Sequence, residues 1–347
     1  MAEATRVALA LGSGGARGYA HIGVIQELEA RGYRIVGIAG TSMGALVGGL
    51  YAAGELDAYT EWVRTLTYRD VLRLLDPALI GPGAVRGEKI LARVTELVGD
   101  TAIEDLPIPF TAVATDLTAH KEVWFQRGRL DAAIRASIAI PGLITPVVMH
   151  GRLLADGGLM NPLPVVATSA FPADVTVAVT LYDDHETRGA WPAAPERIRA
   201  GTIIEPEEAV ASASAWSNRE LMSTVLNWLD NIRGLAPDAG AGGIAGEDAV
   251  AEKDAAVRED AAVREDAAAV VEPLFESLPP GLRTRDVLEL GLDTLRSVVA
   301  RYRLAGYPPD VLITIPRGAG GVMDFHRAEE LIALGRERAR AQLDSGS

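Results

Sequence analysis

The pentapeptide Gly40-Thr41-Ser42-Met43-Gly44 constrains the fold more than any other stretch of this sequence. The apolar residues 35–39 before it have the character of a buried strand, and the small residues 45–53 after it that of a closely packed helix. A serine at the centre of G-x-S-x-G between strand and helix is typical of a nucleophile elbow, a sharp turn that projects the hydroxyl away from the sheet. The flanking glycines lack the Cβ atoms that would collide as strand and helix fold back on each other. A chance match in a glycine-rich turn is the alternative, and the strand–helix context favours the elbow.

The uncharged stretch from residue 35 to residue 54 is as long as a membrane span. Its glycines and the polar Thr41-Ser42 pair at its middle fit a strand, a tight turn and a packed helix better, so we expect soluble core. Residues 1–6 are polar and residues 7–11 are too short an apolar core for a signal peptide. We therefore expect a cytoplasmic protein whose membrane contact, if it makes any, is peripheral and at the inner membrane.

A second glycine-rich segment, residues 12–18, follows a predicted strand at 7–11 and precedes a predicted helix at 19–31. It is not a Walker loop, because no Gly-Lys-Ser/Thr follows it. It is not a dinucleotide fingerprint either, because the third glycine position holds Arg17. Its backbone N–H groups suit an anion, and beside a nucleophilic serine that anion is the oxyanion of a tetrahedral intermediate. An ordinary tight turn between strand and helix is the alternative.

Charge and composition exclude several classes of function. The formal net charge of -14 argues against nucleic-acid partners and against electrostatic attraction to anionic lipid. The chain has no cysteine, which removes disulfides, thiolate catalysis and cysteine-ligated metals.

The rest of the chain alternates short apolar runs with amphipathic segments, the pattern of an α/β protein with a parallel sheet. In the helix at 19–31 we expect Glu27 to point outward, and in the helix at 284–302 we expect the apolar face to point to the core. That face consists of Leu288, Leu295, Val299 and Tyr302. Further strands are predicted at 110–114, 122–126, 146–149, 152–155, 175–181 and 311–315, and further helices at 57–66, 69–75, 88–98, 130–136, 207–233 and 327–342.

We expect one domain over residues 1–347, with a core formed by 6–182 and 284–342. Residues 183–283 are an insertion that contains the long predicted helix at 207–233. Within it, residues 236–270 are of low complexity and include a charged hexad repeat. On a helix, valines spaced six residues apart fall on successively different faces. They therefore do not form the single apolar stripe of a coiled-coil seam. We expect this segment to be solvated and mobile.

The serine needs a base. A Ser…Asp…His order would require His185 or His326, and neither follows a predicted strand. Asp156 ends a predicted strand and is followed by Gly157-Gly158, so a carboxylate acting directly on the serine is a second candidate. An ordinary Asp-Gly-Gly turn is the third, and on pattern alone the more common one.

Three motifs in this order resemble the patatin-like phospholipases, most closely the bacterial members related to the catalytic domain of neuropathy target esterase. They are Gly12-Ser-Gly-Gly-Ala-Arg-Gly18, Gly40-Thr-Ser-Met-Gly44 and Asp156-Gly-Gly158. The stretches 135–141, 156–164 and 324–329 fit as well. The resemblance covers about residues 6–182 and 310–340, and leaves much of 183–283 uncovered.

The resemblance implies a three-layer α/β/α sandwich with a mostly parallel central sheet. It implies a Ser-Asp dyad without histidine, in which Ser42 is the nucleophile and Asp156 the base. The implied substrates are acyl esters of phospholipids, lysophospholipids or related lipids, and no metal or other cofactor is implied. The elbow glycines are Gly40 and Gly44, and the implied oxyanion hole is the first glycine loop, with Gly12, Gly14, Gly15, Ala16 and Arg17.

Two other classes of function stay open at this point. A soluble esterase or thioesterase for short acyl groups would use the same residues. A regulatory or scaffold protein would keep only an inherited lipid pocket. The helices around 57–75 and 207–233 are candidates for a lid or a membrane-facing surface, with ordinary core helices as the alternative. The lipid head group, the acyl position and the oligomeric state do not follow from the sequence.

Overall fold

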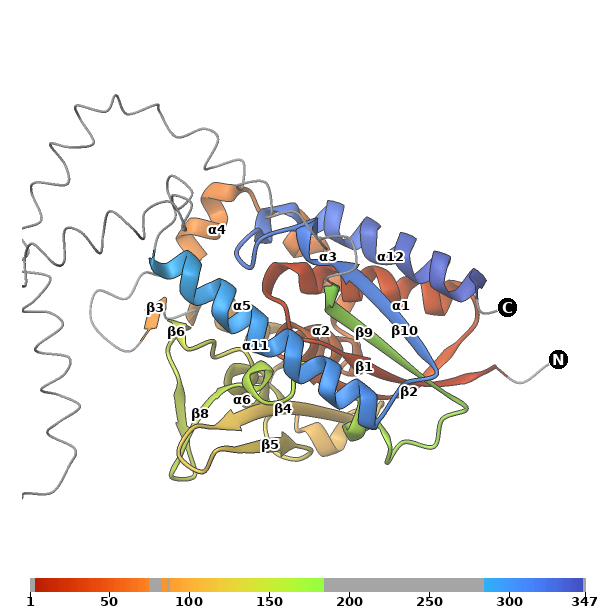
Figure 1. Ribbon diagram of the computed structural model, residues 1–347, viewed down its shortest axis with the longest axis horizontal. Helices are drawn as coiled ribbons and strands as arrows, with labels where there is room; N and C mark the ends of the chain where they lie inside the picture. The colour runs from red at the N-terminus through yellow and green to blue at the C-terminus, as the bar shows by residue number, and fades with distance from the viewer. Residues whose placement is uncertain (1–3, 75–82, 86–87, 184–283, 346–347) are drawn as a thin grey trace, which may run out of the picture. The chain divides into compact units, whose positions relative to one another are not determined.

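The computed structural model describes residues 4–74, 83–85, 88–183 and 284–345, and an eight-stranded sheet lies at its centre (Figure 1). The strand order is β10-β9-β1-β2-β4-β8-β7, with β5 also paired to β4. Strands β10 to β4 in that order run parallel, whereas β5, β7 and β8 are antiparallel to their neighbours. The bounds are β1 Arg6–Leu11, β2 Arg34–Thr41, β4 Phe110–Asp116, β5 Lys121–Phe125, β7 Val147–Met149, β8 Arg152–Asp156, β9 Val175–Asp183 and β10 Val311–Pro316.

The helices connect these strands at the positions that the apolar periodicity predicts. They are α1 Ala20–Ala30, α2 Met43–Ala52, α3 Leu56–Arg64, α4 Tyr68–Leu74, α5 Glu88–Val98, α6 Leu130–Ser137, α11 Thr284–Gly306 and α12 Ala328–Ser345. Short 3-10 turns occur at η1 Gly15–Tyr19, η2 Ile103–Asp105, η3 Gly157–Leu159, η4 Val165–Thr168, η7 Arg317–Ala319 and η8 Phe325–Arg327. The sequence did not predict the small second sheet, in which β3 Gly83–Val85 pairs with β6 Gly142–Ile144.

Successive side chains of the parallel strands point to opposite faces of the sheet, so the core has two layers. Leu9 of β1 and Val179 of β9 belong to the large core cluster that α1, α2 and α12 complete. Their sequence neighbours Ala10 and Ala178 face the opposite side and pack with Leu304 of α11. Figure 1 shows α12 lying along α1, and α11 running across the front of the strands. This is the α/β sandwich with a largely parallel sheet that we predicted.

The strand after the insertion returns to the same sheet. Val311 of β10 pairs with Val177 of β9 in parallel register, as expected for a segment that is integral to the core. Apart from Asp183, which ends β9, the predicted insertion at 183–283, with its helix at 207–233 and its charged segment at 236–270, lies outside the described residues. The assignment of the whole chain to one domain stays a proposal.

Helix α11 is where the sequence analysis placed the wrong face inward. Leu295 and Tyr302, expected in the core, are 64% and 84% exposed. The face that packs against the protein instead carries Asp293, Arg296 and Ser297, all buried. Apolar periodicity located the helix, but polar partners on the sheet side decide its rotation.

Glu27 of α1 also differs from its expectation, since it is buried and not outward-facing. Its carboxylate accepts hydrogen bonds from Arg31 one turn later and from Arg336 and Arg340 of α12. A charge can be buried where several opposite charges surround it. Glu27 therefore joins the two helices that cover one side of the sheet.

The uncharged stretch 35–54 forms β2, a turn and α2, as predicted. Within the part of the chain that the structure describes, no helix has the length and apolar character needed to cross a membrane.

Candidate active site

The turn between β2 and α2 is strained at its central residue. Ser42 has φ 57° and ψ −121°, a left-handed value of φ that residues other than glycine seldom adopt. A Cβ at Gly40 would lie 2.3 Å from the carbonyl oxygen of Gly44, and a Cβ at Gly44 would lie 2.1 Å from that of Leu11. Only glycine fits at both positions, so the chain can pass directly from strand to helix with the serine at the apex.

The hydroxyl of Ser42 donates a hydrogen bond to Asp156. Its Oγ lies 2.5 Å from Oδ2 of Asp156, and both side chains are buried. The other carboxylate oxygen, Oδ1, accepts the backbone N–H of Gly158 at 2.6 Å. Asp156 is the last residue of β8, which pairs with β4 so that it lies opposite Ala114. The structure therefore brings together two residues that are 114 positions apart in sequence.

The environment of Asp156 acts on its proton affinity in two directions. Burial raises the pKa of its carboxyl above the usual value, because desolvation disfavours the charged form. The charge of Arg296, the Ser42 hydroxyl and the Gly158 amide each lower the pKa and oppose that effect. The first of these residues, on α11, was not among the residues that the sequence singled out for a role.

Ser137 anchors the turn from the side of α6. Its Oγ accepts the backbone N–H of Ser42 at 2.8 Å and donates to the carbonyl of Val113 on β4 at 2.6 Å. Ser137 is fully buried. It lies in the stretch 135–141 that fits the resemblance, and no role was predicted for it.

The first glycine loop lies next to the elbow, where the Cβ of Gly44 would meet its backbone. Within the loop, the amide of Gly12 donates to Val179 at 3.0 Å and that of Ala16 donates to Val322 at 2.9 Å. For the amides of Gly14 and Gly15, the described residues provide no acceptor. Of the five residues predicted for the oxyanion hole, these two therefore remain as candidate backbone donors.

Arg17 stabilises this loop from within. Its Nε donates to the carbonyl of Gly14 at 3.3 Å, and its Nη2 lies 3.5 Å from a carboxylate oxygen of Asp293 on α11. Both side chains are buried. Asp293 is a further residue without a predicted role, and no local pattern in the sequence distinguishes it from a solvent-facing acid on an amphipathic helix.

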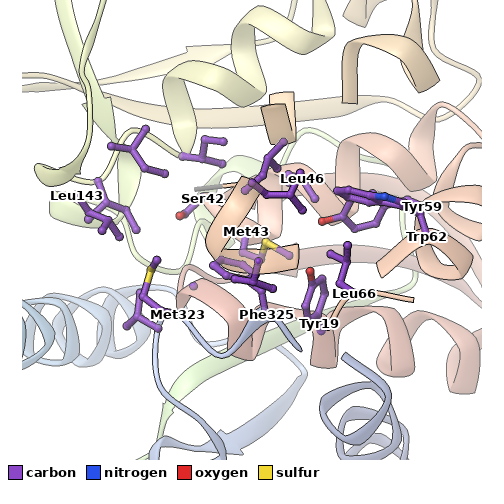
Figure 2. A pocket seen from close by; sticks show the side chains of 18 residues that line it. Tyr19, Ser42, Met43, Leu46, Tyr59, Trp62, Leu66, Leu143, Met323 and Phe325 are labelled. Carbon is purple, nitrogen blue, oxygen red and sulfur yellow. The ribbon is translucent and has the colours of Figure 1, made fainter. Parts of the chain in front are cut away.

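An apolar cavity opens at Ser42. Figure 2 shows Leu46, Tyr59 and Trp62 to one side of the serine and Leu143 and Met323 to the other. The polar side chains in the wall are few. The lining residues are Gly15, Tyr19, Ser42, Met43, Leu46, Tyr59, Trp62, Leu66, Val71, Leu74, Ile90, Ile138, Ile140, Leu143, Ile144, Val322, Met323 and Phe325. Helices α3 and α4, predicted as a lid or as core, contribute to this wall.

No histidine among the described residues bonds to Ser42. His326 packs edge-on against Tyr68, with ring centroids 5.3 Å apart, and His185 lies outside the described residues. His21 is buried, and its Nε2 donates to the carbonyl of Gly12 at 2.8 Å. Burial lowers the pKa of His21 to about 4, so its ring is neutral at pH 7 and supports the glycine loop.

A metal site is not formed by the described part of the chain, where no group of three or more histidine, aspartate or glutamate side chains is placed to hold an ion.

The sequence of this chain is similar to one protein-family model and to several known proteins. A model of the patatin-like phospholipase family matches residues 9–168. An NTE family protein of Mycobacterium tuberculosis is 47% identical over 340 residues, which cover 98% of this chain and 92% of that protein. A lysophospholipase of Mycosarcoma maydis is 36% identical over 196 residues, which cover 52% of this chain and 10% of that protein.

Two further similarities are more distant. Human patatin-like phospholipase domain-containing protein 6 is 34% identical over 190 residues, which cover 52% of this chain and 14% of that protein. Among solved structures, VipD from Legionella pneumophila aligns over 99% of this chain and 67% of its own, with 15% identity and a TM-score of 0.48.

Proposed function

Because this chain belongs to the patatin-like phospholipase family, we propose that it is a serine acyl hydrolase that cleaves fatty-acyl esters of phospholipids, lysophospholipids or related lipids. The observation that carries this proposal is the hydrogen bond between Ser42 and Asp156 at an apolar cavity. A nucleophile paired with a base is what acyl transfer needs, and an apolar cavity is what a fatty-acyl chain needs.

In the proposed reaction the Oγ of Ser42 attacks the acyl carbonyl carbon while Asp156 accepts the hydroxyl proton. The backbone N–H groups of Gly14 and Gly15 stabilise the oxyanion of the tetrahedral intermediate. As the intermediate collapses, the proton passes from Asp156 to the leaving alcohol, and the acyl group stays on Ser42 as an ester. Water then attacks that ester, giving its proton to Asp156. The second intermediate releases the fatty acid and returns the proton to Ser42.

The arrangement of these groups supports the assignment of roles. Asp156 holds the serine with one oxygen and is itself fixed through the other by Gly158, so the base is oriented before substrate binds. The strained φ of Ser42 and its anchor on Ser137 keep the hydroxyl in place. Preorganised groups of this kind reduce the reorganisation that the transition state requires.

The substrate class rests on the cavity and on the relatives. The cavity wall is almost entirely apolar, which suits a long acyl chain, and one relative bears the name lysophospholipase. We propose a cytoplasmic enzyme that meets its lipid substrates through peripheral contact with a membrane.

Active-site labelling with a fluorophosphonate probe tests the nucleophile. We expect labelling of the wild type and none of Ser42→Ala. An unlabelled wild type, or full activity in Ser42→Ala, would reject the proposal. Esters of increasing chain length test the substrate class, and a preference for the shortest would indicate a soluble esterase or thioesterase instead.

The base is tested by comparing two sets of variants. Asp156→Asn should lower turnover by roughly a thousandfold or more, because the general base and its orientation are both lost. Replacement of His185 and His326 together by alanine is the matched control, and should leave turnover within about tenfold. If the double histidine variant loses turnover and Asp156→Asn keeps it, a histidine triad would be the better explanation.

A further inference from the structure

The segment 157–163, which follows the base Asp156 directly, bonds to both other parts of the proposed site. The hydroxyl of Thr41, the residue before the nucleophile, donates to the carbonyl of Asn161 at 2.9 Å. The backbone N–H of Ser13 in the glycine loop donates to the carbonyl of Pro162 at 2.8 Å. Two successive carbonyls of one short segment therefore hold the elbow and the glycine loop beside the base.

Two glycines allow this segment to approach its neighbours so closely. A Cβ at Gly157 would lie 2.2 Å from the carbonyl oxygen of Val113 and 3.0 Å from Cγ2 of Thr41. A Cβ at Gly158 would lie 2.7 Å from Oγ of Ser13. Real Cβ atoms do not fit at such distances from backbone, so the Gly-Gly pair after the base serves the contact with the elbow and the glycine loop.

The side chain of Asn161 fixes the segment from the other side. Asn161 is buried, and its Nδ2 donates to Oε2 of Glu122 on β5 at 2.9 Å. Among the described residues its amide oxygen has no hydrogen-bond partner, so the bond to Glu122 sets the orientation of the amide. The carboxylate of Glu122 also accepts hydrogen bonds from Arg303 of α11 and from the indole of Trp124.

The sheet alone does not bring the nucleophile and the base together. Thr41 at the end of β2 lies opposite Val113 of β4, and Asp156 at the end of β8 lies opposite Ala114, the next residue. With β4 between them, β2 and β8 are about 10 Å apart at this level. The turns after the two strands must therefore set the distance between Ser42 and Asp156, and the bond from Thr41 to Asn161 connects those turns.

We propose that Thr41 and Asn161 are positioning residues for the reaction. The hydroxyl of Thr41 holds the elbow to the segment after the base, and Glu122 orients Asn161 so that its carbonyl meets that hydroxyl. The inference rests on the proposed function, since the distance that these residues set matters only if Ser42 and Asp156 react together.

Thr41→Val tests the bond between the elbow and the segment. Valine keeps the methyl group beside Gly157 and replaces the hydroxyl with a second methyl group. We expect kcat for a p-nitrophenyl acyl ester to fall about tenfold or more, because a displacement of about 1 Å can cost roughly a hundredfold in rate. KM should stay within about twofold, because Thr41 does not line the cavity. Thr41→Ser keeps the hydroxyl and should keep kcat within about threefold.

Thr168→Val is the matched control. Thr168 is also buried, and its hydroxyl also donates to a backbone carbonyl, that of Val165 at 2.7 Å. It belongs to η4, which carries no residue of the proposed site, so its kcat should stay within about twofold of the wild type. Turnover is expressed per molecule that a fluorophosphonate probe labels when the reaction has gone to completion. A loss of stability alone lowers the amount labelled and leaves turnover per labelled molecule unchanged.

The role of Glu122 is tested by a double-mutant cycle. Asn161→Asp places a carboxylate opposite that of Glu122, and should lower kcat per labelled molecule about tenfold or more, because like charges repel and the segment shifts. Addition of Glu122→Gln supplies an amide donor for the new carboxylate, and should recover kcat by about threefold or more. If the second substitution brings no recovery, Glu122 does not orient Asn161 and this part of the proposal is wrong.

The outcomes distinguish this inference from the proposed function. If the wild type is labelled and active, and Thr41→Val retains as much turnover per labelled molecule as Thr168→Val, the positioning role is refuted and the proposed function stands. If Thr41→Ser loses as much as Thr41→Val, the hydroxyl is not the cause and the inference also fails. If the wild type is neither labelled nor active on any acyl ester, the proposed function fails and this inference fails with it.

Discussion

Ser137→Ala tests whether the elbow depends on its anchor. The change deletes one oxygen that accepts the N–H of Ser42 and donates to the carbonyl of Val113. Alanine fits the space but leaves a buried donor and a buried acceptor without this partner. Each such group costs about 1–3 kcal/mol, so the free energy of unfolding should fall by about 2–6 kcal/mol. A domain in the middle of the ordinary range of about 5–15 kcal/mol remains folded after this loss.

The same substitution should lower turnover in the folded protein. Without its anchor, the strained backbone of Ser42 is free to relax and to carry the hydroxyl away from Asp156. A displacement of about 1 Å can cost roughly a hundredfold in rate, so we expect kcat to fall about 10- to 100-fold. KM should change little, because Ser137 is not among the residues that line the cavity.

Urea unfolding and steady-state kinetics on an acyl ester measure the two effects. Ser169→Ala is a suitable control, since the Ser169 hydroxyl also bonds to a carbonyl, that of Val166, but is exposed. This control should stay within about 0.5 kcal/mol of the wild type. If Ser137→Ala is as stable and as active as the control, the elbow does not need its anchor and our reasoning about its strain is wrong.

Two further predictions concern the core and the cavity. The ion pairs of Glu27, chiefly with Arg340, lower its pKa to about 2 from 4.5, so its stabilisation is present above pH 4.5 and is lost as the pH falls toward 2. The shift corresponds to an upper limit of about 3 kcal/mol, which solvent screening of the exposed arginines reduces to about 1–2 kcal/mol. Glu27→Gln should therefore unfold at lower urea than the wild type at pH 7 but not near pH 2, and an equal difference at both pH values would contradict this account. Leu46→Trp fills the cavity beside Ser42 and should slow hydrolysis of long-chain esters about tenfold more than that of short-chain esters, whereas equal slowing would mean that the acyl chain does not lie there.

The sequence predicted those parts of the site that depend on local backbone chemistry. Gly40 and Gly44 permit the close approach of strand and helix that this turn needs, and the structure has that turn. The pairing of Ser42 with Asp156 followed only from the resemblance, because an Asp-Gly-Gly turn on its own also fits an ordinary loop. Nothing in the local pattern of Asp156 reveals that β8 returns antiparallel to β4.

The errors share one physical cause. Glu27 and the inward face of α11 were assigned from hydrophobic periodicity, which counts apolar residues and treats charges as solvent-facing. In both places arginines that include some from distant segments surround a carboxylate, so a charged side chain is buried. Such arrangements depend on the tertiary structure and leave no repeat in the sequence.

The position of α11 in the chain has a consequence for biosynthesis. Arg17 and Asp293 are 276 residues apart, so the ion pair between them forms only after nearly the whole chain has left the ribosome. Ser42 and Asp156 are both synthesised long before that. The support that Arg17 gives to the carbonyl of Gly14 is therefore completed by a helix that is synthesised long after the glycine loop and the elbow. The loop beside Ser42 takes its final form late in folding, although its own sequence lies at the start of the chain.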